Sequence, residues 1–309
     1  MRLLRVRAGV VALVGLALLT GACSSDDDSG SEAKTLVIGS APFAESVILA
    51  NMYAKALETK GYTVQLKSGL GQREIYLPAL EKGGRDNGID LVPEYVGTML
   101  EFVNKNAGEA SGDLDRTVSK LRERLEPLGI SVLTPSPAAD QNAFAVTRAT
   151  ADRLKLTKLS DVAPVAGEMT LGAGAECPTR PFCQPGLEKT YGLKFKGFRP
   201  LDSCGPRTVE ALANDDVQIG LVCSSQGAVA ARNLVVLEDD KKLQTVDNIV
   251  PAIRKEVAGG EVTEVLNRIS SELNTPDLTL LNKRVEIDKE DPAVVAESWL
   301  GDHGLLTKS

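Results

Sequence analysis

Residues 35–64, TLVIGSAPFAESVILANMYAKALETKGYTV, decide the fold class of this chain. A short apolar run ends at Gly39. In the helical pattern that follows, Val47, Ile48 and Met52 fall on one face, and the segment YTVQL is typical of a second strand. A strand, a helix and a further strand in this order predict a parallel βαβ unit, the repeating element of an α/β protein.

The same alternation predicts helices and strands along the next part of the chain, namely helices at 73–81, 97–104 and 114–125 and strands at 89–92 and 130–133. The stretch TPSPAADQN, residues 134–142, interrupts this rhythm because proline favours extended backbone. A second series then follows, with strands expected at 143–147, 169–173 and 217–222 and helices at 149–154 and 187–191.

Residues 233–256 are interpreted as a return crossing into a closing strand, and three helices at 262–273, 276–285 and 292–300 complete the chain. We therefore predict an α/β fold with two lobes, each a mixed, mostly parallel sheet flanked by helices. Lobe I would contain residues 34–138 plus 246–309, and lobe II residues 139–245, with two crossing strands between them. A hinge of this kind lets two lobes close on a ligand held between them.

The first residues carry a targeting pattern. Basic residues precede a short apolar run, and the small residues TGA lead to Cys23 and the polar sequence SSDDDSGS. This order is typical of a bacterial lipoprotein, so we predict a signal peptide at 1–22, acylation of Cys23 and a polar tether at 23–33. Acyl chains would anchor the protein in the cell envelope, at the outer face of the cytoplasmic membrane. Because Thr20 stands where leucine is usual, secretion with soluble release is the alternative.

The charge of the chain bears on its partners. The formal net charge is −7. Nucleic acids select basic protein surfaces, so we expect no nucleic-acid partner. The sequence has no internal repeat and no coiled-coil pattern, and we expect a monomer.

Once Cys23 is acylated, an even set of cysteines remains, namely Cys177, Cys183, Cys204 and Cys223. In an oxidising compartment such a set predicts two disulfides. Three pairings are possible, and we favour Cys177 with Cys183 and Cys204 with Cys223. A zinc site is the competing interpretation, but the chain has no CxxC pair and its one histidine, His303, lies far away in sequence. We therefore expect no metal.

Three loops are candidate ligand contacts. In GSAPFAES, Ser40, Ala41 and Glu45 follow the first strand and would lie at the carboxyl edge of the sheet, where open α/β sheets place ligands. The simpler interpretation is that Ser40 only caps a helix. The segment PEYVGT would bring Tyr95 and Thr98 to the same edge, with a glycine that allows close approach of the chain.

The third loop, ECPTRPFC, presents Arg180 in a segment that a disulfide could clamp. A guanidinium held in this way suits a carboxylate or another anionic group.

Motifs of enzymes are mostly missing. The chain has no GxSxG, Walker A or HExxH motif, and His303 has no evident nucleophile around it. An enzyme would need an acid–base pair in the cleft, for which Glu45 and Asp247 are the only candidates. We expect a binding protein that is not an enzyme and has no cofactor.

Six segments together resemble a known family in content and order, namely GSAPFAESVILANMYAKALETKGYTV, GLGQREIYLPAL, IDLVPEYVGT, ADQNAFAVTR, TRPFCQPGLEKTYGLKF and VVLEDDK. The family is that of substrate-binding proteins of osmoprotectant ABC importers, which bind glycine betaine, choline, carnitine and related solutes. The resemblance covers nearly all of the chain after the leader. It implies a bilobal periplasmic-binding-protein fold of type II, with two crossing strands.

The resemblance also implies roles for individual residues. In that family, aromatic side chains surround a quaternary ammonium group, and an arginine from the second lobe holds a carboxylate. Tyr95 matches a tyrosine of this cage, and Arg180 matches the arginine. Ala41 stands where the family usually has a lysine.

Three other cage positions depart from the family, because Asn142, Cys223, and Asp247 or a neighbour stand where aromatic residues are expected. Since one ring contributes about 0.5 to 2 kcal/mol towards a cation, this pocket would hold betaines less tightly. The pocket would also be more polar, with possible hydrogen-bond partners at Asn142, Ser224, Ser225 and Gln226. An inward-pointing Asp247 could still attract a cation.

The expected function is that of a solute-binding lipoprotein of an ABC importer. It would capture a small polar, osmoprotectant-like solute between two lobes and deliver it to the membrane-spanning permease, because the ligand favours the closed state. One alternative is the same fold with specificity for a bulkier hydroxylated or aromatic ligand. The other is a structural or signalling lipoprotein with no role in transport.

Overall fold

The computed structural model describes residues 35–306 of the chain. The expected signal peptide, Cys23 and the polar tether lie outside these residues. Within residues 35–306, none of the helices has the length and apolar character needed to cross a lipid bilayer.

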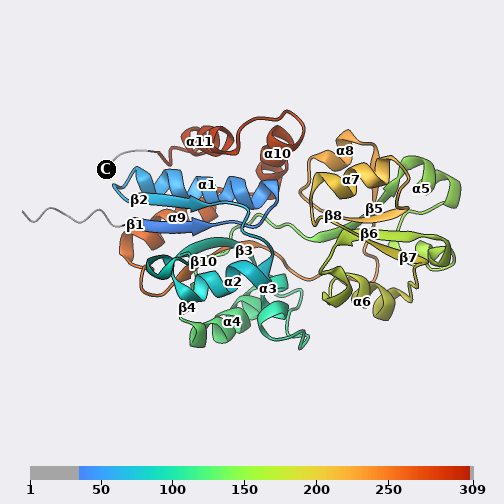
Figure 1. Ribbon diagram of the computed structural model, residues 1–309, viewed down its shortest axis with the longest axis horizontal. Coiled ribbons are helices and arrows are strands. Elements are labelled where there is room, and N and C mark those ends of the chain that lie inside the picture. The colour runs from blue at the N-terminus through green and yellow to red at the C-terminus, as the bar shows by residue number, and fades with distance from the viewer. Residues whose placement is uncertain (1–34, 307–309) are drawn as a thin grey trace, which may run out of the picture. The chain divides into compact units, whose positions relative to one another are not determined.

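The described strands form two sheets of five strands each, in the orders β2-β1-β3-β10-β4 and β7-β6-β8-β5-β9 (Figure 1). The first sheet contains β1 (Thr35–Gly39), β2 (Thr63–Lys67), β3 (Leu91–Tyr95), β4 (Ile130–Val132) and β10 (Ile249–Arg254). The second contains β5 (Asn142–Thr147), β6 (Thr170–Gly174), β7 (Gly197–Leu201), β8 (Ile219–Cys223) and β9 (Leu234–Leu237).

In each sheet, one strand runs in the opposite direction to the other four. Strand β10 is antiparallel to β3 and β4, and β5 is antiparallel to β8 and β9. The remaining pairs are parallel. The predicted α/β class, with mixed, mostly parallel sheets, is therefore confirmed.

Helices cover both faces of the first sheet (Figure 1). One face packs against α1 (Ala44–Glu58), α9 (Gly260–Glu272), α10 (Thr275–Glu286) and α11 (Pro292–Asp302). The other packs against α2 (Arg73–Lys82), α3 (Val96–Val103) and α4 (Leu114–Leu125). Aliphatic side chains such as Leu49 and Leu266 fill these layers. Helix α1 is buried around most of its circumference, and of its predicted apolar face Ile48 and Met52 are fully buried whereas Val47 is partly exposed.

The second sheet has its own core on each face. Helices α7 (Pro206–Ala213) and α8 (Ala228–Ala231) cover one face. Helices α5 (Arg148–Leu154) and α6 (Gln184–Gly186), with the π-helical turn Leu187–Tyr191, pack with the other core. Short 3₁₀ segments complete the described chain at Gly84–Asp86, Glu126–Leu128, Leu159–Val162, Ala166–Glu168 and Cys177–Thr179.

The chain passes between the sheets twice. It leaves the first sheet after β4 and returns to it at β10, and the two connecting segments meet in an antiparallel bridge between Ala139 and Asn248. These paired segments lie between the carboxyl ends of parallel strands of both sheets, which is where open α/β sheets bind ligands.

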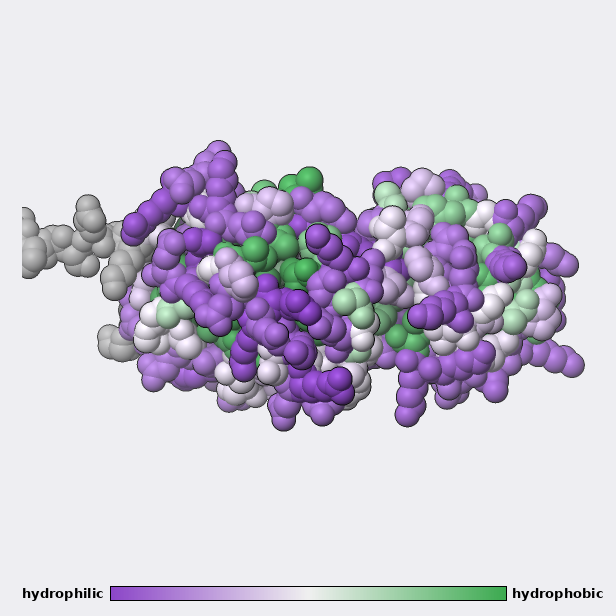
Figure 2. All heavy atoms as spheres, turned by 90° about the horizontal axis from the view of Figure 1, so that it is seen from below, coloured by the Kyte–Doolittle hydropathy of each residue, from purple (hydrophilic) through white to green (hydrophobic). Residues whose placement is uncertain are grey.

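The face shown in Figure 2 is mostly hydrophilic, with apolar areas enclosed by polar side chains. Large exposed apolar residues occur on separate elements, including Ile75 on α2, Val236 on β9 and Leu280 on α10. Single exposed apolar side chains of this kind are normal on soluble domains and mark no particular site.

Candidate functional site

A cavity of about 100 Å³ lies between the ends of the two sheets. Its aromatic lining residues come from both sheet regions and are Phe43, Tyr76, Tyr95, Phe102 and Phe182. Its charged lining residues are Arg73, Glu101, Asp140, Glu176, Arg180 and Asp247. Aromatic faces and carboxylates in one cavity are the two kinds of group that attract an organic cation.

Most of the ligand contacts expected from the sequence lie on the cavity wall, namely Ala41, Tyr95, Thr98, Asn142, Arg180, Cys223 and Asp247. They reach it because they follow or precede strands at the same edges of the sheets. Ser40, Glu45 and Ser224 are not part of this wall.

Ser40 has a structural position. It is fully buried, and its hydroxyl accepts a hydrogen bond from the backbone N–H of Gly69 at 3.0 Å, which fixes the turn after β2. Helix α1 instead begins after Phe43, and its N-cap has no side-chain hydrogen bond. Ser40 therefore does not cap α1 and is not part of the cavity wall; its hydroxyl instead holds the turn at Gly69.

Glu45 and Ser224 lie behind the cavity wall. The Glu45 carboxylate accepts a hydrogen bond from the Tyr95 hydroxyl at 2.7 Å. The Ser224 hydroxyl donates to Asp140 Oδ1 at 3.1 Å. Both side chains therefore lie outside the cavity wall and support residues that form it.

Beside the cavity lies a buried ion pair between Arg73 of α2 and Glu94 of β3. Arg73 Nε and Nη2 donate to the two oxygens of Glu94 at 3.1 and 2.7 Å. The Tyr76 hydroxyl donates to the same carboxylate at 2.6 Å. Glu94 is fully buried, so these donors compensate its charge and fix the ring of Tyr76 in the wall.

Asp247 belongs to the returning segment and faces the first turn of α3. Its Oδ1 accepts from the backbone N–H groups of Gly97 and Thr98 at 2.9 and 3.0 Å. Burial raises the pKa of Asp247 to about 7, although the hydrogen bonds from Thr98 and the charge of Arg73 act in the opposite direction. A Cβ atom at Gly97 would lie 2.4 Å from the carbonyl oxygen of Val246, so this close approach requires glycine.

Arg180 belongs to the half of the protein that contains the second sheet, but its side chain contacts residues of helices that cover the first sheet. Its Nη2 lies 2.9 Å from Glu74 Oε1, and its guanidinium carbon lies 4.7 Å from the centre of the Phe102 ring. In addition, Asn106 Nδ2 donates to the carbonyl oxygen of Thr179 at 3.3 Å. The loop that carries Arg180 therefore contacts α2 and the end of α3.

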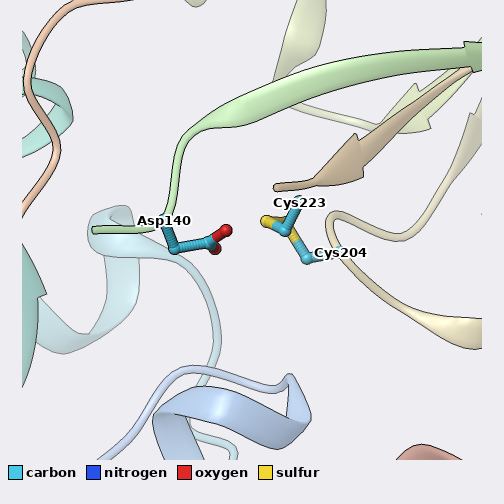
Figure 3. Close-up of side chains that lie close together, drawn as sticks. All are labelled: Asp140, Cys204 and Cys223. Carbon is cyan, nitrogen blue, oxygen red and sulfur yellow. A yellow bond between two sulfur atoms is a disulfide. The ribbon is translucent and has the colours of Figure 1, made fainter. Parts of the chain in front are cut away.

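The structure contains the disulfides Cys177–Cys183 and Cys204–Cys223. Both line the cavity, and the second faces Asp140 (Figure 3). The ligand-type atoms of Asp140, Cys204 and Cys223 lie within 4.8 Å of one another. Zinc requires cysteine as thiolate, and joined sulfurs do not supply it, so this group does not fit the zinc alternative.

Several wall residues were not predicted from the sequence, chiefly Arg73, Tyr76, Phe102 and Asp140. Arg73 and Tyr76 lie at the start of α2, just after the turn GLGQ, and the local sequence has no motif that marks them as ligand contacts. Asp140 lies in the first crossing segment. Its position between the two predicted lobes could have identified it as a cavity residue. Phe102 lies near the end of a helix, and nothing in its local pattern distinguishes it from a core residue.

Comparison with known proteins gives a consistent result. The family model described as "Substrate binding domain of ABC-type glycine betaine transport system" matches residues 34–302. The chain is 29% identical over 292 residues to the glycine-betaine-binding protein of Pseudomonas aeruginosa, and the match covers 89% of this chain and 90% of that protein. It is 25% identical over 295 residues to a carnitine transport binding protein of Listeria monocytogenes, with 94% of each chain covered.

The fold is also similar to solved structures. One structure, described as a glycine betaine/carnitine/choline ABC transporter, matches with a TM-score of 0.69 at 25% sequence identity. The match covers 88% of this chain and 100% of that one. The two-sheet architecture is therefore that of bilobal periplasmic binding proteins.

Proposed function

Because the chain belongs to the family of substrate-binding domains of ABC-type glycine betaine transport systems, we propose that the cavity between its sheets holds a small osmoprotectant-like solute with a cationic head group. As the extracytoplasmic component of an importer, the protein delivers this solute to the ABC permease. The ligand acts by favouring the closed arrangement of two lobes, and no bond is made or broken.

The observation that carries the ligand proposal is the composition of the cavity wall. Tyr95 and Phe43 present aromatic rings whose centres lie 6.1 Å apart, and Asp140 and Asp247 are in the same wall. The hydrogen-bond donors to Asp140 are neutral groups of Ser224 and Ser225. A bound cation would therefore find both π faces and carboxylate charge.

The organisation that we propose has lobe I at residues 34–138 plus 246–309 and lobe II at 139–245. The connecting segments that meet at Ala139 and Asn248 support this division, because each sheet lies wholly on one side of them. We also propose that the protein works as a monomer, with residues 1–22 removed and Cys23 acylated as its membrane anchor.

A second candidate is the same receptor with altered specificity for a bulkier hydroxylated or aromatic solute. The specific observation in its favour is that Ala41, Asn142 and Cys223 line the cavity. These small or polar side chains stand where the resemblance leads us to expect a lysine or aromatic rings. Compared with the cavity expected from the resemblance, this cavity has more space, more hydrogen-bonding groups and fewer aromatic rings.

The test is isothermal titration of the mature domain with glycine betaine, carnitine, choline, polyols and polyphenols. For a cationic solute, Tyr95→Leu should weaken binding by about fivefold, because it removes one π face worth about 1 kcal/mol. Val236→Ala, on the outer strand β9, is the control and should leave the dissociation constant unchanged.

Each outcome of this titration decides between the candidates. Binding of a quaternary ammonium compound with the loss in Tyr95→Leu supports the proposal. Binding of polyols or polyphenols alone supports altered specificity. If no compound binds to the wild-type protein, the proposed function is wrong.

A further inference from the structure

Three buried polar side chains from distant parts of the sequence meet behind the cavity wall. Glu45 lies at the start of α1, Ser225 in the turn after β8, and Asn282 on α10. Their exposed fractions are 3%, 0% and 1%. Since Ser225 belongs to the second sheet and the other two pack with the first, this is a contact between the two halves of the binding protein.

Glu45 is the centre of this contact. Its Oε1 accepts from the Tyr95 hydroxyl at 2.7 Å, and its Oε2 accepts from Asn282 Nδ2 at 2.6 Å and from the Ser225 hydroxyl. Tyr95 is a ring of the cavity wall. One carboxylate therefore joins a ligand-facing ring to a residue of the opposite half.

Ser225 also forms a hydrogen bond with a second buried carboxylate. Its backbone N–H donates to Asp140 Oδ1 at 2.9 Å, and Asp140 again lines the cavity. The series Tyr95, Glu45, Ser225 and Asp140 thus begins and ends on the cavity wall. A displacement of the turn at Ser225 would disturb both ends.

Asn282 completes the cluster. Its Nδ2 also donates to the carbonyl oxygen of Ser225 at 3.1 Å. Its Oδ1 is buried with no hydrogen-bond partner among the described residues. Asn282 therefore contacts Glu45 and Ser225 through its donor nitrogen, which holds α10 against the turn after β8.

We propose that Glu45 is a positioning residue that couples the ligand-facing ring of Tyr95 to the turn at Ser225, so that ligand binding and contact between the two halves reinforce one another. This inference rests on the proposed function, since only a ligand cavity gives the Tyr95 ring an occupant. Glu45 acts through its neighbours and does not touch the ligand.

The charge state of Glu45 should affect how strongly the two halves are held together. Burial, followed by the charge of Asp140, raises the pKa of Glu45 to about 8. Tyr95, Ser225 and Asn282 face Glu45 with neutral donors. Separation of the halves would expose the carboxyl to water and lower this pKa. The joined arrangement therefore takes up a proton, and it should weaken as pH rises towards 8.

Other carboxyls lie near the cluster and titrate in the same range. Burial raises the pKa of Asp140 to about 6 and that of Glu286 to about 7. Glu286 accepts from the backbone N–H of Ala228 in the same turn, and Lys289 counteracts its shift. Asp247, with Arg73 beside it, belongs to the same group. Charge on Asp140 and Asp247 attracts a cation, so their ionisation strengthens ligand binding as pH rises, opposite to the effect of Glu45. The contribution of Glu45 is therefore measured as the difference between the wild type and Glu45→Gln.

The experiment measures the dissociation constant of glycine betaine, or of choline if only choline binds, between about pH 6.5 and pH 8.5. The wild type and Glu45→Gln should bind equally at pH 6.5. Relative to Glu45→Gln, whose side chain at position 45 stays neutral, wild-type affinity should then fall as pH rises, by up to about tenfold per pH unit. Glu45→Ala should bind about tenfold more weakly at every pH, because Tyr95 loses its acceptor.

A double-mutant cycle separates positioning from general destabilisation. If Glu45 acts through Ser225, the effects of Glu45→Gln and Ser225→Ala on affinity at pH 8 should not add. Asp90→Asn is the matched control, since Asp90 is a buried carboxylate that holds the backbone of Val37 and Gly84 at 2.9 and 2.8 Å. It should lower the melting temperature and leave the pH slope unchanged.

Hydrogen exchange of the ligand-free protein keeps this inference separate from the proposed function. Glu45→Ala should increase exchange at residues 223–228, while Asp90→Asn should not. If no probe binds to the wild type, the proposed function fails, and this exchange result still decides the coupling. Unchanged exchange, an equal pH slope in Glu45→Gln, or additive effects in the cycle would overturn the coupling.

Discussion

At the scale of single residues, Arg180 illustrates competition between a ligand and the protein for one charged group. Its guanidinium lies over the Phe102 ring and is paired with Glu74, whose side chain is 50% exposed. An exposed ion pair of this kind contributes about 0.5 kcal/mol. A ligand carboxylate could therefore displace Glu74 at small cost, whereas the Phe102 ring would keep the guanidinium in place.

The consequence is a prediction for Glu74→Gln. This substitution frees Arg180 from its ion pair, so affinity for carboxylate-bearing glycine betaine should rise about two- to threefold relative to choline, which lacks a carboxylate. Isothermal titration at low salt measures the ratio of the two dissociation constants. Glu210→Gln, which breaks the exposed pair with Arg232 on the outer surface, is the matched control. An unchanged ratio would mean that Arg180 does not face the ligand.

The sequence predicts where residues lie better than it predicts their partners. Tyr95 and Asn142 reach the cavity because they stand at strand ends, which periodicity locates. Glu45 stands one residue into α1, and its contact with Ser225 depends on how two distant segments pack. No local pattern contains that information.

At the scale of elements, the strands and helices with clear periodicity are where the sequence predicted them. Leu234–Leu237, assigned from the sequence to the return crossing, forms strand β9 of the second sheet instead. Strand β7, with the sequence GFRPL, was missed. It lies at the edge of the second sheet and pairs only with β6, so it needs neither a continuous apolar face nor a full set of backbone donors. The segment at 187–191 was expected to be an ordinary helix and forms a π-helical turn instead.

The two disulfides should differ in their contribution to stability. Cys204–Cys223 joins residues 19 positions apart and ties the loop before α7 to the end of β8, whereas Cys177–Cys183 spans 6 positions. In the chain-entropy model, replacing the longer bridge by serines costs about 3 kcal/mol of unfolding free energy and the shorter one about 2 kcal/mol.

Urea denaturation of the two double-serine variants measures this difference directly. Cys177→Ser with Cys183→Ser serves as the control for Cys204→Ser with Cys223→Ser, because both bridges line the same cavity. A larger loss from the shorter bridge would show that local packing, and not loop length, decides the contribution.

At the scale of the whole molecule, buried carboxyls set the dependence of stability on pH. Burial raises the pKa of Glu45 to about 8, of Asp247 to about 7 and of Asp140 to about 6. The folded protein keeps protons that the unfolded chain releases above its ordinary carboxyl pKa of about 4.5. The free energy of unfolding should therefore decrease as pH rises from about 5 to about 8.

Scanning calorimetry across this range should show a falling melting temperature, by about 2 to 4 °C for each kcal/mol lost. The double variant Glu45→Gln with Asp140→Asn should show a flatter profile, because two of the titrating groups are removed. A melting temperature that rises steadily to pH 8 would contradict the raised pKa values.

The strand order also has a consequence for synthesis of the chain. Strand β10 lies between β3 and β4, so the first sheet has a gap at its centre until residue 254 has been made. The second sheet uses only residues 142–237, which are contiguous. During translation or export, the inserted half is complete before the half that starts the chain. Until then, the edge of β3 is open to pairing with any other extended segment, including one from a neighbouring nascent chain.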